Sequence, residues 1–369
     1  MNKGFDSRKD KEKMKKVLIG MSGGVDSSVS ALLLKEKGYE VIGATMKLWE
    51  SDDECVEGGC CNLNSTMDAK RVCDVLNIPH YVLNFKEEFN KCVIQDFISE
   101  YKKFRTPNPC IECNKYLKFG MMYEMAKKLN CDYIATGHYA KMEYSDEYGK
   151  YVLRKAQNLS KDQSYVLYNM PKQLLGKVLF PLGDFESKED VRKIAKEHNL
   201  SVASKPDSED ICFIPDGNYK KFLEQNSSIV PKEGNIVNRK GEILGIHTGL
   251  YNYTIGQRKG LGISYKAPLF VIGFNKERNE VIVGEQQELY RKEMKVNEVN
   301  LLLMDKIEMT LDVTVKIRYA SKPAEAIINQ TEAGNIQVIF KEPQRGITPG
   351  QSAVFYIGDV VVGGGKIQD

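Results

Sequence analysis

Apolar residues in the first half of the chain alternate between short runs and runs with helical spacing. Four short β-rich runs predict strands at 17–20, 41–46, 81–85 and 133–136. Between them, apolar residues recur every three or four positions and predict helices at 27–37, 66–76, 89–104 and 118–129. This alternation predicts a doubly wound, parallel α/β sheet over 17–215, with ligands beyond the carboxyl ends of its strands.

The pattern changes twice towards the C-terminus. Glycines punctuate short apolar runs over 216–287, which predicts a small β-rich module. Over 288–369, apolar and polar residues alternate, so that one face of each run is apolar. The residues expected on these apolar faces are Val313, Val315, Ile317, Tyr319, Ile336, Val338, Phe340, Val354 and Tyr356. We therefore expect a C-terminal antiparallel β-barrel.

Length and hydropathy limit the class of protein. With 369 residues, the chain exceeds one average domain, so two or three domains are expected. No apolar run approaches the roughly 18 residues of a membrane span. Residues 1–16 form a charged leader without the apolar segment of a secretory signal. These features predict a cytoplasmic protein with a flexible basic leader and no membrane partner.

The net charge gives no general sign of nucleic-acid binding. The formal charge is +3, but residues 1–16 hold seven Lys/Arg and three Asp/Glu, a net +4, so the rest of the chain carries −1. Any RNA would have to be held by local basic patches and not by a globally basic surface.

The segment between the first predicted strand and the first predicted helix carries the clearest chemical signal. Its residues are Gly20, Met21, Ser22, Gly23, Gly24, Val25, Asp26, Ser27 and Ser28. The glycines allow the backbone to approach an anion, the helix start offers N–H groups and a positive dipole end, and the serines add donors. Because the loop lacks the lysine of a Walker A motif, transfer of a γ-phosphoryl group is not favoured. It resembles the pyrophosphatase loop of adenylating enzymes; a Gly/Ser turn before an ordinary helix is the alternative.

Nine cysteines without a secretory signal indicate reduced thiols that serve chemistry or metal binding. Cys110 and Cys113 form a CxxC motif framed by prolines ahead of a predicted helix, a position that lowers a thiol pKa. This placement favours nucleophilic sulfur or a metal site over cysteines that only fill space. Cys212 lies where the α/β pattern ends, and taken alone it is as readily a packing residue.

The other six cysteines divide into two groups. Three fall within helix or strand patterns, where a thiol packs as a small hydrophobic group: Cys73, Cys92 and Cys131. Three others lie within seven residues: Cys55, Cys60 and Cys61. Since no His or fourth thiol stands at zinc-finger spacing from these three, a loop beside the active site is favoured over a metal site.

Two polar segments are candidate parts of a site. Gly137 and His138 close a predicted strand, which places Gly137 for close approach to a nucleotide and His138 at the mouth of the site. A strand-end histidine with a satisfied hydrogen bond is the alternative. Lys161, Asp162 and Gln163 form a compact polar segment, which by itself is typical of a solvated turn.

Eight motifs, in order along nearly the whole chain, resemble those of the bacterial tRNA-specific 2-thiouridylases, a family of the PP-loop (ATP pyrophosphatase) superfamily. They are the glycine loop and residues 46–49 (MKLW), 106–114 (TPNPCIECN), 119–120 (FG), 135–139 (ATGHY), 161–165 (KDQSY), 207–213 (DSEDICF) and 253–258 (YTIGQR). The glycine loop alone indicates only the superfamily, whereas the two spaced cysteine motifs and the middle module are specific to the family. The resemblance implies a PP-loop catalytic domain of the adenine nucleotide alpha hydrolase type at 17–215.

The resemblance also implies an activity and its cofactors. The family uses ATP and Mg²⁺ to adenylate the C2 oxygen of the wobble uridine, position 34, in the tRNAs for Lys, Glu and Gln. Sulfur then replaces this oxygen to give 2-thiouridine, with AMP and pyrophosphate released. A cysteine desulfurase or a sulfur-relay protein would supply the sulfur.

The resemblance assigns roles residue by residue. ATP is expected at Gly20, Met21, Ser22, Gly23, Gly24, Val25, Asp26, Ser27, Met46 and Gly137. The target base is expected beside Asn108, Pro109 and Cys110, with Cys113 as the nucleophile and Cys212 as the persulfide carrier. The positions that match tRNA contacts are His138, Lys161, Asp162, Gln163, Arg318, Tyr319 and Gln351.

Cys110 departs from the family pattern, because many relatives carry Asp at this position. Cys110, Cys113 and Cys212 could together bind three irons of a [4Fe-4S] cluster and leave a fourth iron for sulfide. This cluster and the two-thiol relay stay open as alternatives. Two rival functions also stay open: another PP-loop ligase that acts on a small substrate, and a tRNA-binding sulfur carrier without ATP chemistry.

Overall fold

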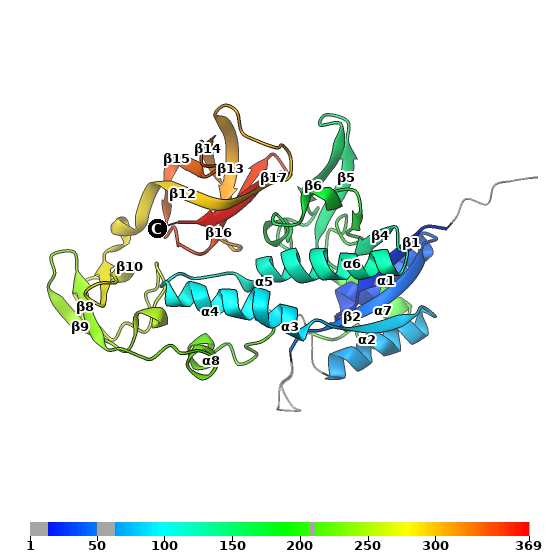
Figure 1. Ribbon diagram of the computed structural model, residues 1–369, viewed down its shortest axis with the longest axis horizontal. Coiled ribbons are helices and arrows are strands. Elements are labelled where there is room, and N and C mark those ends of the chain that lie inside the picture. Colours follow the sequence, from blue (N-terminus) through cyan, green and yellow to red (C-terminus); the bar gives the residue numbers. More distant parts are fainter. Residues whose placement is uncertain (1–13, 50–62, 207–210, 369) are drawn as a thin grey trace, which may run out of the picture.

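A computed structural model describes residues 14–49, 63–206 and 211–368 of the chain. Figure 1 shows a parallel sheet with helices at one end, a small β module at the other, and a β-barrel above the helices between them. The predicted leader lies outside the described residues except for its last three, and Lys16 already begins the first strand. Within the described residues, no helix combines the length and the apolar character needed to cross a membrane.

The first part is a five-stranded parallel sheet in the order β3-β2-β1-β4-β7. Its strands are β1 (Lys16–Gly20), β2 (Glu40–Lys47), β3 (His80–Asn84), β4 (Tyr133–Ala135) and β7 (Val178–Leu179). The four strands predicted from apolar runs are confirmed within one residue at each end. The fifth, β7, has only two residues and gave no sequence signal.

The helices of this part cover both faces of the sheet, as the doubly wound prediction requires. Leu18 joins a core cluster with residues of α4 and α6, whereas Val17 and Ile19 join another with α1, α2 and α7. The helices are α1 (Val25–Glu36), α2 (Leu63–Val75), α3 (Lys86–Phe89), α4 (Gln95–Lys102), α5 (Pro109–Glu112), α6 (Met122–Lys128) and α7 (Lys188–Glu197). The predicted helix at 89–104 is α3 and α4 joined by a π-helical turn at 90–94, and that at 118–129 begins earlier, because α5 continues through a π-helical segment at 113–121.

The middle of the chain forms the small β module that the glycine pattern predicted. After α8 (Tyr219–Asn226), four strands pair in the order β10-β11-β8-β9. They are β8 (Gly234–Asn238), β9 (Ile243–His247), β10 (Phe270–Asn275) and β11 (Glu280–Gly284). Phe104, just beyond α4, packs against the core of this module.

The last part is the predicted antiparallel barrel, closed because β12 pairs with both β15 and β17. Its strands are β12 (Tyr290–Leu301), β13 (Leu311–Lys316), β14 (Ala324–Gln330), β15 (Ile336–Arg345), β16 (Ser352–Ile357) and β17 (Val360–Ile367). A hairpin of the first part, β5 (Ala140–Ser145) and β6 (Lys150–Lys155), extends this sheet by pairing with β17. The barrel is thereby attached to the first part through backbone hydrogen bonds.

The expected apolar faces of the barrel are confirmed with two corrections. Val313, Val315 and Ile317 are buried in the barrel core, and so are Ile336, Val338 and Phe340. Val354 and Tyr356 instead point out of the barrel and join the core of the first part, because β16 is covered on both faces. Tyr319 lies beyond the end of β13 and is 43% exposed.

Candidate functional site

The glycine loop lies at the carboxyl end of β1, beside the carboxyl end of β4, where the strand order of the sheet switches direction. Gly23 has φ +71°, and a Cβ there would stand 2.2 Å from the Ser65 carbonyl oxygen. A Cβ on Gly137 would stand 2.8 Å from the Ser27 nitrogen. The loop therefore requires glycine at both places, and it occupies the position where doubly wound sheets bind their ligands.

Serines hold the loop around the start of α1. The Ser27 hydroxyl accepts from the Ser22 N–H at 3.2 Å and donates to the Gly24 carbonyl at 3.1 Å. The Ser28 hydroxyl donates to the same carbonyl at 2.8 Å. Gly24, at the N-cap of α1, offers no side chain to the first N–H groups. An anion bound here would meet these N–H groups and the positive end of the helix dipole.

Two lysines that the sequence did not single out lie against this loop. The Lys188 ammonium, at the start of α7, donates to both carboxylate oxygens of Asp26 at 2.7 and 2.6 Å. The Tyr139 hydroxyl donates to the same carboxylate at 2.9 Å. The Lys205 ammonium donates to the Gly23 carbonyl at 3.0 Å and to Asp68 at 2.9 Å. Both cations thus lie beside the expected phosphate position, although they are far from the loop in the sequence.

Met46, the other residue expected at ATP, lies near the carboxyl end of β2, which neighbours β1 in the sheet. Its half-buried side chain packs against the same core cluster as Leu18. The sheet therefore brings Met46, Gly137 and the glycine loop to the same edge, although they are spread over more than a hundred residues.

The CxxC motif lies at the start of a helix, with Cys110 in α5 and Cys113 as the first residue of the π-helical segment that continues it. The Asn108 side chain caps this helix by accepting from the Cys110 N–H at 3.2 Å, and Pro109 occupies the first helical position. Cys110 is exposed, whereas Cys113, one turn later, is buried. The cap therefore directs the two thiols to different environments, one open to a substrate and one sheltered.

All three parts of the protein meet at the segment before this motif. The Thr106 N–H donates to the Pro349 carbonyl at 3.0 Å, and the Gln351 amide donates to the Thr106 carbonyl at 2.7 Å. The Thr106 and Thr254 hydroxyls lie 3.2 Å apart. The barrel and the middle module therefore both hold the CxxC loop in place.

Cys212 packs against the large core cluster that also contains Cys113. The neighbouring Phe213 anchors this segment, with its ring 5.4 Å from that of Phe97 in α4 and 5.7 Å from that of Phe89. Across 14–49, 63–206 and 211–368, no three His, Cys, Asp or Glu side chains are grouped to hold a metal ion. Cys110, Cys113 and Cys212 are thus not gathered as cluster ligands in this conformation.

The remaining cysteines behave largely as expected. Cys73 is buried in the sheet core, and burial raises the pKa of its thiol to about 12. Cys92 and Cys131 are half-buried against the other core, and burial raises the pKa of Cys131 to about 11. The thiols of Cys73 and Cys131 therefore stay protonated at neutral pH. Cys55, Cys60 and Cys61 lie outside the described residues.

Several residues expected at tRNA are engaged inside the protein. His138 is buried between the Thr136 hydroxyl at 2.8 Å and the Lys118 ammonium at 3.3 Å, and burial lowers its pKa well below 6.5. The Asp162 carboxylate is buried and accepts from the Ala156 N–H, the Ser164 N–H and the Ser164 hydroxyl. Gln163 accepts from the Tyr139 N–H at 2.9 Å, and Lys161 is half-buried.

Arg318 and Gln351 join parts of the molecule. The Arg318 guanidinium donates to the Ile255 carbonyl of the middle module at 3.1 Å, to the Gly346 carbonyl of the barrel at 2.6 Å, and to Thr348. Tyr319, next in the chain, is the exposed member of the set. The expected tRNA contacts therefore stay predictions, and two of these side chains, Gln351 and Arg318, also hold the parts of the protein around the segment before the CxxC motif.

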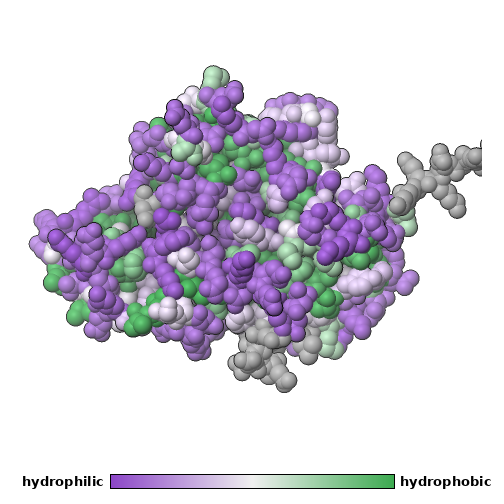
Figure 2. Space-filling view, in the orientation of Figure 1, coloured by the Kyte–Doolittle hydropathy of each residue, from purple (hydrophilic) through white to green (hydrophobic). Residues whose placement is uncertain are grey.

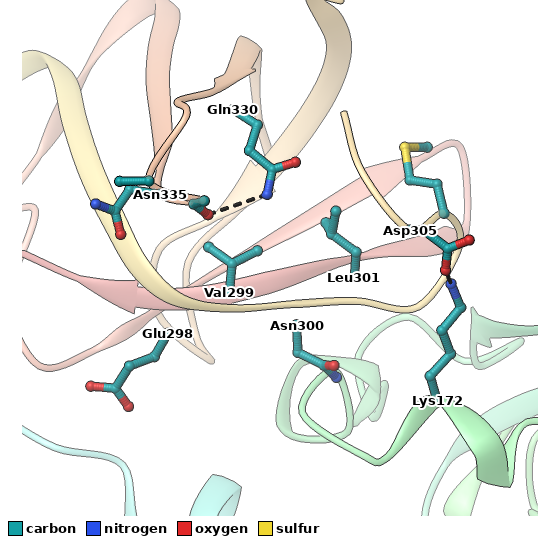
Figure 3. A pocket seen from close by; sticks show the side chains of 11 residues that line it. Lys172, Glu298, Val299, Asn300, Leu301, Asp305, Gln330 and Asn335 are labelled. Carbon is teal, nitrogen blue, oxygen red and sulfur yellow. Dashed lines mark hydrogen bonds and ion pairs between the residues drawn. The ribbon is translucent and has the colours of Figure 1, made fainter. Parts of the chain in front are cut away.

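A pocket of about 450 Å³ lies away from these loops, between β12 and the catalytic part. Figure 3 shows the Lys172 ammonium paired with Asp305 and the Gln330 amide donating to the backbone at Gly334. The Asn300 amide donates to the Tyr168 and Met170 carbonyls at 2.8 and 2.9 Å. The polar groups of this pocket thus connect the barrel to its neighbour, and none belongs to the glycine loop or the CxxC motif.

Comparisons with known proteins agree with this arrangement along nearly the whole chain. The tRNA methyl transferase HUP domain family matches residues 15–216, the tRNA methyl transferase PRC-barrel domain family matches 220–285, and the aminomethyltransferase beta-barrel domain family matches 291–367. A protein named tRNA-specific 2-thiouridylase MnmA from Acetivibrio thermocellus is 52% identical over 96% of this chain and 99% of its own length. A protein of the same name from Clostridioides difficile is 50% identical over 96% of this chain and 98% of its own. With its glycine loop and CxxC segment in place, the chain therefore belongs to the tRNA-specific 2-thiouridylase family.

Proposed function

We propose that this chain is a tRNA-uridine 2-sulfurtransferase. It adenylates the C2 oxygen of uridine 34 in the tRNAs for Lys, Glu and Gln and replaces this oxygen by sulfur. The observation that carries the proposal is one α/β domain that combines a pyrophosphatase-type loop at its switch point with a capped CxxC segment presenting Cys110 and Cys113. The relatives named 2-thiouridylases, at about half identity over nearly the full length, support the class of substrate.

The glycine loop is suited to ATP and to the pyrophosphate that leaves from it. Uncapped N–H groups at the start of α1 and the hydroxyl of Ser22, which is exposed, would meet phosphate oxygens. Lys188 and Lys205 place positive charge at the edges of the loop. Gly137 lets the end of β4 approach the loop without a side chain between them.

Mg²⁺ would supply further charge neutralisation when bound with ATP. The carboxylate nearest the expected phosphates is Asp26, which Lys188 and Tyr139 already contact. Since the described residues hold no group of three candidate ligands, the ion would be held mainly by phosphate oxygens and water, as is usual for Mg²⁺ with nucleotides.

The first chemical step makes the C2 oxygen a good leaving group. The uracil O2 attacks the α-phosphorus of ATP, the bond between that phosphorus and the bridging oxygen breaks, and pyrophosphate departs. A wobble base inside stacked RNA shields its C2 atom, so the base must leave the stack to react. The exposed Cys110 and the helix-capping Asn108 border the expected position of that base.

The second step brings sulfur to C2. A donor gives Cys212 a persulfide, whose terminal sulfur bonds to C2 while AMP leaves with the former carbonyl oxygen. Cys113 thiolate then attacks the Cys212 Sγ, the sulfur–sulfur bond of the persulfide breaks, and 2-thiouridine and a Cys113–Cys212 disulfide result. The relay requires Cys113 and Cys212 to come into contact, and both side chains belong to or border the same extended core cluster. Because the three thiols are not grouped as metal ligands in the described conformation, no step is assigned to an iron–sulfur cluster.

Mass spectrometry of tRNA nucleosides tests the proposal. Unmodified tRNA is incubated with ATP, Mg²⁺ and a persulfide source, with and without oxygen, and pyrophosphate release is followed in parallel. We expect 2-thiouridine with the wild-type protein in both conditions, and loss of 2-thiouridine with tRNA-dependent pyrophosphate release retained in Cys113→Ser and Cys212→Ser. Cys131→Ser, a half-buried thiol outside the motif, is the matched control and should act like the wild type.

Other outcomes select the rival functions. Pyrophosphate release that needs no tRNA and survives both cysteine substitutions would indicate a ligase for a small substrate. Persulfide formation and tRNA binding without ATP consumption would indicate a sulfur carrier. Thiolation only in the absence of oxygen, by a brown protein, would favour the cluster over the relay. The cytoplasmic location expected from the sequence stays a prediction.

A further inference from the structure

Two half-buried lysines lie on the outer face of the barrel, where it contacts the first part, and the charge of Lys155 acts on Lys316. Lys316 is the last residue of β13, on the face opposite to the buried Val315, and Lys155 is the last residue of β6. The Lys316 ammonium lies 5.8 and 5.5 Å from the ring centroids of Tyr165 and Tyr319. The Lys155 ammonium lies 4.3 Å from that of Tyr356. Neither lysine belongs to the motifs that the family resemblance assigned.

This lysine pair has little negative charge around it. In the described part of the chain, the polar contact of Lys155 is the Gly358 carbonyl at 3.1 Å, and neither ammonium forms an ion pair. The charge of the Asp162 carboxylate raises the pKa of both lysines, but the oxygens of this carboxylate already accept three hydrogen bonds. Asp359, which also acts on Lys155, pairs with Arg154 at 2.7 Å.

The electrostatics of the pair favour an anion. Burial lowers the pKa of both ammonium groups, and Lys155 adds to this effect on Lys316 because the two cations repel each other. Both side chains keep partial access to solvent. A ligand with negative oxygens would replace the water lost on burial and relieve the repulsion, whereas a neutral ligand would do neither.

The neighbours of the pair point to RNA as the source of that anion. Tyr319 presents a 43% exposed ring, 6.1 Å from the buried ring of Tyr165, and an exposed aromatic ring beside cations is how proteins hold single-stranded bases and their backbone. The thiol of Cys110 is near enough to contribute to the raised pKa of Tyr319, after burial and Asp162. Lys316 thus lies against the ring of Tyr319, which is within electrostatic range of Cys110 in the segment expected to receive the target base.

Figure 2 shows that hydrophilic side chains cover most of the face in view and that hydrophobic ones occur in small groups. We infer that Lys155 and Lys316 form a binding site for backbone phosphate of the tRNA strand next to the target uridine, with Tyr319 stacking on an adjacent base. This inference rests on the proposed function and adds to it the residues that hold the substrate strand.

Salt-dependent tRNA binding tests the inference. The dissociation constant of unmodified tRNA is measured from low to moderate KCl for the wild type, Lys155→Met and Lys316→Met. Methionine keeps an apolar side chain against the tyrosine rings and removes the charge. We expect binding about tenfold weaker for each variant at low salt, and a slope of log K against log salt smaller by about 0.7–0.9 per lost contact.

Three controls make the result specific. Lys341→Met removes an exposed barrel lysine that pairs with Glu325 at 2.8 Å, and it should leave the affinity and the salt slope unchanged. Lys316→Arg keeps the charge and should restore most of the slope. Circular dichroism and urea unfolding of both methionine variants report that they are folded.

The outcomes separate this inference from the proposed function. Wild-type affinity and slope in both methionine variants would overturn the phosphate site, while the proposed function would stand if 2-thiouridine is still made. Methionine variants that bind tRNA as the wild type does but bind free pyrophosphate more weakly would also overturn the inferred tRNA phosphate site, because the two lysines would then bind a different anion. Failure of the wild-type protein to bind tRNA would overturn both.

Discussion

Substitution of Gly137 by alanine tests the close approach of β4 to the glycine loop. The added Cβ would stand 2.8 Å from the Ser27 nitrogen, 2.9 Å from the Asp26 carbonyl carbon and 3.1 Å from its oxygen. All three atoms belong to the backbone, at the first turn of α1. No flexible side chain can move aside to make room.

The size of the effect follows from this geometry. For the shortest contact to reach 3.4 Å, where ordinary van der Waals contact begins, the strand end and the helix start must separate by about 0.6 Å. The hydrogen bond from Tyr139 to Asp26, two residues beyond Gly137, resists that movement. Overpacking of this kind costs about 1–3 kcal/mol, and if the loop takes up the strain, ATP affinity falls roughly 5- to 150-fold.

Calorimetry of ATP binding, together with tRNA-dependent pyrophosphate release, measures this effect. We expect a higher Kd for ATP and a lower kcat/KM for ATP, with an unchanged Kd for tRNA. Gly273→Ala in β10 is the matched control, because the Cβ there would meet only the Ile282 side chain at 4.0 Å. Wild-type ATP affinity in Gly137→Ala would refute the claim that contact between β4 and the loop shapes the nucleotide site.

Two further predictions concern charges near the site. Lys188→Met removes the ammonium group that contacts Asp26 and keeps the bond from Tyr139. We expect kcat/KM for ATP in pyrophosphate release to fall by roughly 10-fold or more, and Lys188→Arg to be closer to wild type. A methionine variant with the kcat/KM of the wild type would contradict this role. Burial holds the pKa of His138 well below 6.5, so the unfolded state binds the proton first and stability falls as the pH drops below about 6.5. Urea unfolding at pH 7.5 and 5 should therefore show a smaller loss of stability in His138→Gln than in the wild type, and an equal loss would refute the assignment.

The parallel sheet could be predicted from the sequence because its central strands β1 and β2 are buried on both faces. Val17, Leu18 and Ile19 are consecutive and fully buried, so a short apolar run between helical patterns was enough to place β1. The glycine loop was equally readable, since the conformation at Gly23 and the close approach at Gly137 admit no other residue without strain.

Long-range contacts could not be predicted in this way. The pair between Lys188 and Asp26 spans 162 residues, and the charged start of α7 has the pattern of any solvated helix. Alternation places Val354 and Tyr356 on an apolar face, but it does not show which elements cover that face, and in the structure the first part of the chain covers it. The pairing of β6 with β17 is made by backbone hydrogen bonds, which do not require particular side chains and so give no signal in the sequence.

The barrel and the middle module contribute to the site by holding the segment before Cys110. A Cβ on Gly350 would stand 2.8 Å from the Arg105 Cβ and 2.9 Å from the Thr106 nitrogen, so the barrel fits against this segment in one register. The bonds from Gln351 to Thr106 and from Arg318 to Ile255 fix the two other parts relative to the same segment. Arg318 and Gln351, which a motif match assigns to tRNA contacts, therefore also fix the position of the CxxC segment. The motif identifies these two residues in the sequence, but it does not show which groups of the protein they bond to.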